Sequence, residues 1–220
     1  SPRFKKGNKM YFGLSEDQIF FQDNVKKFLE DNAPLDVIRN ISKGENPNQK
    51  NEIHSGIINL GINNILVPEE HGGLGLDLLF AAAISQSIGG AIAPLPYCGS
   101  YVMAPIAIQI GASKSQKENI FNEMSSGNTK FGIAFSEYFG SRDSSSINFS
   151  NEKINGKTIF AIDCDYATDV LVSDASGKIG IVSIEDKNIE IVDLITVDKT
   201  RTYKEIKFSN ANVEILENTK

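Results

Sequence analysis

VPEEHGGLGLDLLFAAAISQSIGGAIAPLPY, residues 67–97, is the stretch that decides the fold of this chain. Three of the four positions 72–75 are glycine, which indicates backbone that turns tightly or is closely approached. The apolar residues 65–67 before it predict the end of a strand, and a helix rich in small residues is expected from Asp77 to about Gly89. One face of that helix would let another helix or a ligand come near; it carries Ala81, Ala82, Ala83, Ser85 and Ser87.

Composition restricts the class of protein. The 220 residues are 40% hydrophobic and 23% charged, with a net charge of −6, as in an ordinary globular chain with a proper core. The acidic balance and the lack of a basic stripe exclude nucleic acid or an anionic membrane as the main partner. No apolar run approaches the ~18 residues of a membrane span. Residues 1–10 lack the apolar core of a signal peptide, so we expect a bacterial cytoplasmic protein.

Cysteine and histidine are scarce. Cys98 and Cys164 are far apart and have no metal-ligand spacing, so we expect two unpaired thiols in a reducing cytosol. The chain has only two histidines, which excludes a histidine-rich metal site. We expect His54 on the surface of a helix and His71 as a hydrogen-bonding residue of the glycine-rich turn.

The pattern is helical from Ser15 to about Gly127. A capping box at residues 15–18 opens the first helix, and Pro34 allows a second one to start. Residues 42–51 are polar and predict a loop. Three further helices are expected, besides the one after the glycine-rich turn, at residues 53–60, 97–110 and 114–125.

After Asn128 the spacing of the apolar residues changes from the period of a helix to that of a strand. Six β-branched or aromatic runs follow, at residues 131–136, 157–163, 169–173, 179–184, 188–192 and 203–208. Asn155-Gly156 and Ser176-Gly177 are expected to form hairpin turns. The chain is therefore predicted to be α+β, with an all-α helical domain and a β-barrel or sandwich domain that meet near residue 128.

Several of these segments resemble the acyl-CoA dehydrogenase family. The stretch 67–97 is similar to its "PEEHGG-G" and "GRA-AP-PY" text. FGIAFSEYFGSRD, residues 131–143, resembles the motif A-x-S/T-E-P-x-x-G-S-D, although Tyr138 replaces the proline and the Gly-Ser is displaced. FAIDCDYATDVLVS at 160–173 and VDKTRTYKEIKF at 197–208 resemble a branch found as one subunit of heteromeric bacterial enzymes. The likeness covers roughly residues 14–215.

The resemblance implies an FAD site on the β domain. It assigns the flavin-contacting hydroxyl to Ser136, which otherwise is a strand residue facing water, and backbone contacts to Ala134 and Phe135. Phe160 stands where the family often has a tryptophan stacked on the flavin. Two further flavin contacts are implied at Ala161 and Ile162, but Ile162 has no hydroxyl where the family usually has threonine. Arg142 is also assigned to the cofactor site, and contact with acyl-CoA or with a neighbouring loop stays open for it.

The resemblance also implies three domains. Residues 10–127 match the N-terminal helical domain, 128–215 the middle β domain, and 216–220 the start of a C-terminal four-helix domain that carries the catalytic base. We therefore expect that four-helix domain to be absent and assign no catalytic residue and no metal. The function implied is α,β-dehydrogenation of an acyl-CoA, with electrons passed from FAD to an electron-transferring flavoprotein, in a homo- or hetero-oligomer. A non-catalytic partner subunit or assembly module of a heteromeric enzyme is the alternative.

Overall fold

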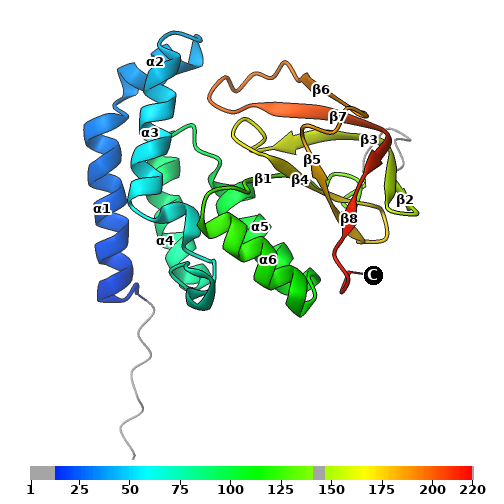
Figure 1. Cartoon of the computed structure of the whole chain (residues 1–220). Helices are drawn as coiled ribbons and strands as arrows, with labels where there is room; N and C mark the ends of the chain where they lie inside the picture. The colour runs from blue at the N-terminus through cyan, green and yellow to red at the C-terminus, as the bar shows by residue number, and fades with distance from the viewer. Residues whose placement is uncertain (1–12, 141–146, 220) are drawn as a thin grey trace, which may run out of the picture.

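A computed structural model of the chain describes residues 13–140 and 147–219, and in these the helices precede the strands (Figure 1). The helices all lie before residue 126, and the strands begin at residue 131. The α-helices are α1 (Glu16–Asn32), α2 (Leu35–Ser42), α3 (Pro47–Asn59), α4 (Leu78–Gly90), α5 (Ala104–Gly111) and α6 (Lys114–Ser125). Short 3-10 turns, η1 (Ile62–Asn64) and η2 (Glu69–His71), and a π-helix, η3 (Tyr97–Met103), connect them.

Capping explains where the helices begin. The Ser15 hydroxyl accepts the Gln18 amide and the Gln18 side chain returns to the Ser15 amide, which confirms the predicted capping box of α1. Ser113 and Gln116 form a second capping box at the start of α6, and the Asp77 carboxylate caps the start of α4. Helices α1, α3 and α4 then bury a common core of Val25, Leu29, Ile53, Ile57 and Ile84.

The glycine-rich turn folds back on the residues before it. The Gly75 amide donates to the Val67 carbonyl and the Leu76 amide to the Ile65 carbonyl, at 2.8 Å each. A side chain on Gly73 has no space, because its Cβ would lie 2.0 Å from the Val67 carbonyl oxygen. Close approach of backbone, rather than an unusual dihedral angle, therefore requires glycine at position 73.

The strands form one mixed sheet of eight. They are β1 (Phe131–Ala134), β2 (Asn148–Ser150), β3 (Lys153–Ile162), β4 (Asp169–Ser173), β5 (Ile179–Ser183), β6 (Ile189–Asp193), β7 (Tyr203–Asn212) and β8 (Glu214–Ile215). The order is β6-β7-β3-β1-β4-β5-β8, and β2 pairs with β3 outside that path. β1 is parallel to β4, whereas the other pairings are antiparallel.

Each face of the sheet has its own core. Strands β5 and β7 are not hydrogen-bonded to each other, but they are in contact. The sheet therefore curls around a core that includes Ile154, Val170, Val182 and Ile206. The other face of β1 and β4 packs Phe131, Ile133 and Leu171 against α5 and α6. Figure 1 shows α5 and α6 between the remaining helices and the sheet. The predicted α+β class is confirmed, while the division into two domains near residue 128 stays a prediction.

Three local predictions were wrong. The expected loop 42–51 is shorter, because Pro47 occupies the first turn of α3, where its missing amide hydrogen costs nothing. Residues 65–67 form turns around η1 rather than a strand end. Asn155-Gly156 lies inside β3, beside a register shift against β7, and the hairpin turn before it is made by Asn151 and Glu152, both with positive φ. None of the helices in the described ranges is long and apolar enough to cross a membrane.

Replacing Gly73 tests the close approach in the glycine-rich turn. Gly73→Ala should lower the free energy of unfolding by about 3 kcal/mol, because the new methyl group overlaps the Val67 carbonyl. Gly89→Ala is the matched control: it adds the same methyl group in α4 where nothing lies within 4 Å. It should raise stability by about 0.5 kcal/mol through helix propensity. Urea unfolding followed by circular dichroism measures both, and equal effects would contradict the prediction.

Candidate functional site

The end of β1 and the end of β3 lie together. The strands run antiparallel with Ile133 opposite Ile162, so residues 134–136 lie beside the segment that leads up to Ile162. The Ser136 and Thr158 hydroxyl oxygens are 2.9 Å apart and form a hydrogen bond. Ser136 is half-buried and Thr158 is fully buried. The structure thus brings together the six described residues predicted to contact the flavin, three at the end of β1 and three at the end of β3.

Phe160 is held outward at this edge. Its backbone is left-handed, with φ of +57°, in the irregular part of β3 between Thr158 and Ala161. The residue is 57% exposed, and its ring lies edge to face with that of Tyr203, with centroids 6.5 Å apart. An exposed aromatic face beside a hydroxyl pair suits the stacking of a flat ring system. Ala161 is buried in the core inside the curled sheet, and Ile162 is half-buried against the core on the face covered by α5 and α6.

The residues after Ser136 point in different directions. One Glu137 carboxylate oxygen is buried and has no hydrogen-bond partner among residues 13–140 and 147–219. Tyr138 and Phe139 are exposed and meet edge to face. Arg142 lies outside the described residues, so its predicted role has no structural account.

The π-helix η3 is fastened to the sheet by Asp163. The carboxylate of Asp163 accepts hydrogen bonds from the amides of Gly99, at 2.5 Å, and Ser100, at 3.4 Å. The Ser100 hydroxyl donates to the Phe131 carbonyl on β1. A Cβ at Gly99 would lie 2.7 Å from the same carboxylate, so only glycine fits there. Burial raises the pKa of Asp163, while these two amides act to lower it.

His54 is buried, and the prediction that it lies on a helix surface was wrong. It is 7% exposed; its Nε2 lies 2.8 Å from the Tyr101 hydroxyl, and its ring stacks on Tyr166 with centroids 3.9 Å apart. Burial lowers the pKa of His54 to about 4, and the positive charges of Lys130 and Lys50 act in the same direction. The imidazole is therefore neutral at pH 7. His71 does lie in the turn, as predicted, and its carbonyl accepts a hydrogen bond from Ser125.

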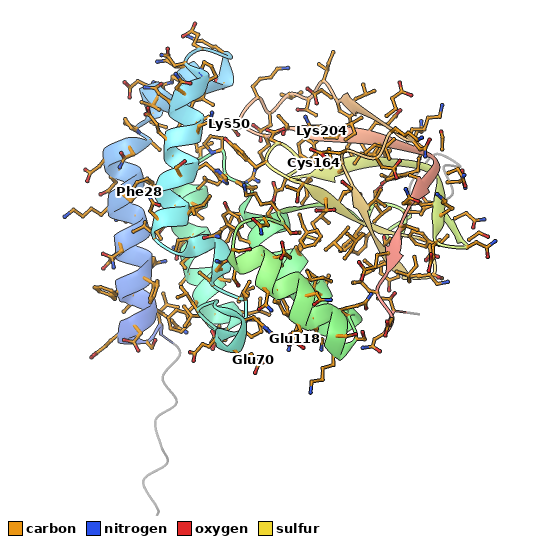
Figure 2. All side chains as sticks on the ribbon, in the orientation of Figure 1. Phe28, Lys50, Glu70, Glu118, Cys164 and Lys204 are labelled. Atoms are coloured by element: carbon orange, nitrogen blue, oxygen red, sulfur yellow. The ribbon has the colours of Figure 1, made fainter. Side chains whose placement is uncertain are left out.

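Ion pairs add a second contact between helices and sheet. Asp165 lies 2.7 Å from Lys50 of α3 and 3.2 Å from Lys204 of β7, and Lys204 also pairs with Asp193. Figure 2 shows Lys50 and Lys204 at the junction of α3 and the sheet, with Cys164 nearby. Lys50 also lies 5.7 Å from the ring centroid of Tyr166. Both cysteines are free, as expected, Cys98 exposed and Cys164 buried.

Comparison with known families decides the identity of the chain. Residues 15–128, more than half of the chain, match the family described as "Acyl-CoA dehydrogenase, N-terminal domain". The chain belongs to the acyl-CoA dehydrogenase family. The predicted resemblance is thereby confirmed for the helical residues that carry the stretch 67–97.

Relatives in this family extend the match over the strands. The probable acyl-CoA dehydrogenase YngJ of Bacillus subtilis is 27% identical in an alignment of 183 residues that covers 77% of this chain and 46% of that protein. A chain of the ChsE4-ChsE5 complex from Mycobacterium tuberculosis has the same fold, with a TM-score of 0.77 at 18% identity over 96% of this chain. A glutaryl-CoA dehydrogenase from Mycobacterium smegmatis, in complex with FADH2, gives 0.71 at 12% identity over 94% of this chain.

The chain spans about half the length of these acyl-CoA dehydrogenases: 46% of the curated relative, and 58% and 55% of the two solved chains. The contacts of His54 and Asp163 were missed by reading the sequence. His54 lies between Ile53 and Ile57, on the apolar side of α3, and that position was the signal that could have revealed its burial. No comparable signal points from Asp163 to Gly99, because 64 residues separate them.

The buried imidazole predicts how stability depends on pH. The pKa of His54 falls from 6.5 to about 4 on folding. Between these two pH values His54 is therefore protonated in the unfolded chain and neutral in the folded chain. The free energy of unfolding should therefore decrease as the pH falls through this window, by up to about 3 kcal/mol. Urea unfolding at pH 7 and pH 5 measures the slope. His54→Gln should flatten that slope; an unchanged slope would show that other groups cause it.

Removing the Asp163 carboxylate tests the link between η3 and the sheet. Asp163→Ala should lower the free energy of unfolding by about 2 kcal/mol, since the Gly99 amide loses its acceptor, the Ser100 amide keeps only the Pro96 carbonyl, and alanine tolerates the left-handed backbone poorly (φ +58°). Asp163→Asn keeps an acceptor and a residue suited to positive φ, so it should cost less than half as much. Thermal unfolding compares the two variants, and equal losses would contradict the capping role.

Proposed function

We propose that this chain forms part of an FAD-dependent acyl-CoA dehydrogenase that removes hydrogens from the α and β carbons of an acyl-CoA thioester. The observation that carries the proposal is the edge of the sheet where β1 and β3 end. There an outward-facing phenylalanine, Phe160, adjoins the paired hydroxyls of Ser136 and Thr158. Membership of the family supports the same reading.

The residues at this edge fit a flavin ring. FAD, when bound, supplies an acceptor for the hydride that leaves the β carbon. We propose that Phe160 stacks on the ring, that the Ser136 hydroxyl donates a hydrogen bond to it, and that Ala134 and Phe135 contribute backbone contacts. Thr158 orients the Ser136 hydroxyl through their 2.9 Å contact. We assign only backbone contacts with the ring to Ala161 and Ile162, because their side chains pack into cores on opposite faces of the sheet.

A non-catalytic partner subunit is the second candidate. Ile162 has no hydroxyl, and Tyr138 stands where the family motif has proline, so the flavin site departs from the usual pattern. The general base of the family matches no residue of this chain. We propose that this chain alone binds flavin weakly at best and does not turn over acyl-CoA. An electron-transferring flavoprotein as acceptor, and a homo- or hetero-oligomeric assembly, belong to the same proposal.

Flavin titration of the purified chain tests the proposed site. Phe160→Ala should weaken FAD binding about tenfold, because the stacking surface is lost. Ser136→Ala should weaken it about threefold through one lost hydrogen bond. Phe20→Ala is the matched control: Phe20 is equally exposed but lies on α1. Flavin fluorescence measures each affinity.

The outcomes separate the two candidates. If Phe160→Ala and Phe20→Ala bind FAD alike, the assignment of Phe160 is wrong. If the unaltered chain binds no FAD at all, the partner subunit becomes the better account. Dehydrogenation of acyl-CoA by the purified chain, assayed with an artificial electron acceptor, would contradict the expectation that it is inactive alone.

A further inference from the structure

A cavity of about 190 Å³ lies where α3, η3 and the end of α6 meet the start of β1. Its walls are mainly apolar and aromatic: Ile58, Pro96, Met124, Phe131, and the stacked rings of His54 and Tyr166. Tyr101 closes it beside His54. The cavity therefore has a rigid aromatic wall, because stacking and a hydrogen bond both hold the His54 ring.

One side of the cavity is polar and carries a positive charge. Asn63, Asn64, Thr129 and Lys130 line it, and their side chains form no hydrogen bond with any residue that the structure describes. Lys130 makes no ion pair within 4.0 Å in the same residues, and none of the residues lining the cavity is acidic. Unused donors together with an unneutralised ammonium group favour an anionic ligand group.

The size and the walls restrict the rest of the ligand. An apolar cavity of about 150 Å³ is large enough to bind benzene. A cavity of about 190 Å³ therefore holds one six-membered ring with a small substituent. A carboxylate is the small planar anion that amide, hydroxyl and ammonium donors can bind together. Stacked aromatic rings in the wall favour a flat ring over a flexible chain, because a flat ring loses little conformational freedom on binding.

We propose that this cavity is a binding site for a monocyclic aromatic carboxylate, with the ring against His54, Tyr166 and Met124 and the carboxylate beside Lys130. The site goes beyond the proposed dehydrogenase function. It adjoins Phe131 at the start of β1, whereas the proposed flavin-contacting residues lie at the other end of that strand. None of the described residues assigned to FAD lines the cavity.

Methionine methyl signals test this site with benzoate as the probe. The chain has only three methionines, and of the two that the structure describes, Met103 and Met124, the second lines the cavity. In the purified chain with labelled methionine methyl groups, benzoate should shift the Met124 signal in a saturable way and leave the Met103 signal unchanged. No saturable shift, or equal shifts of both signals, would overturn the proposal.

Variants separate the ring from the charge. Ile58→Trp fills the cavity and should abolish the Met124 shift, whereas Ile110→Trp makes the same change at an isoleucine of α5 that is 71% exposed and should not affect it. Lys130→Met should weaken benzoate binding about tenfold through loss of a charge-assisted contact, without changing the binding of benzyl alcohol. If benzyl alcohol binds the unaltered chain as tightly as benzoate, the carboxylate assignment is wrong. The circular dichroism spectrum of each variant verifies that it is folded.

Discussion

The carboxylate of Asp163 accepts the Gly99 and Ser100 amides of the π-helix, and this contact determines how the helices meet the sheet. A wide π-turn leaves amides at its start without partners in the helix, so a buried acceptor there stabilises both the turn and its position. Gly99 brings the two backbones close enough for that contact. The Ser100 hydroxyl then attaches the same turn to the first residue of β1, the strand that ends two residues before Ser136.

β1 is short, yet both sites depend on it. It pairs with β3 on one side and β4 on the other, and its side chains are buried along its whole length. Its first residue, Phe131, forms a wall of the cavity near His54, and the residues after its end lie beside Phe160. The packing of Phe131, Ile133 and Leu171 against α5 and α6 makes these two places parts of one rigid layer.

Local sequence patterns predicted most helices and strands, whereas contacts between residues far apart in the sequence could not be predicted from them. A capping box placed the start of α1, and β-branched runs located six strands, because both signals act within a few residues. Only the family resemblance predicted that Ser136 and Phe160, near the ends of β1 and β3, contribute to one site. The hairpin turn predicted at Asn155-Gly156 was wrong, because pairing with β7 keeps β3 extended through these residues. His54 was misplaced because its partners, Tyr101 and Tyr166, lie far along the chain.

The separation of 64 positions between Gly99 and Asp163 has a consequence for synthesis on the ribosome. Chains emerge from their N-terminus, and helices with local contacts form early. The helices up to α6 can therefore form while Asp163 is still untranslated. Until then the Gly99 amide lacks its acceptor, and the apolar side of α5 and α6 is uncovered. A pause in translation before residue 163 would prolong that exposed state, in which chaperones and proteases compete for the nascent chain.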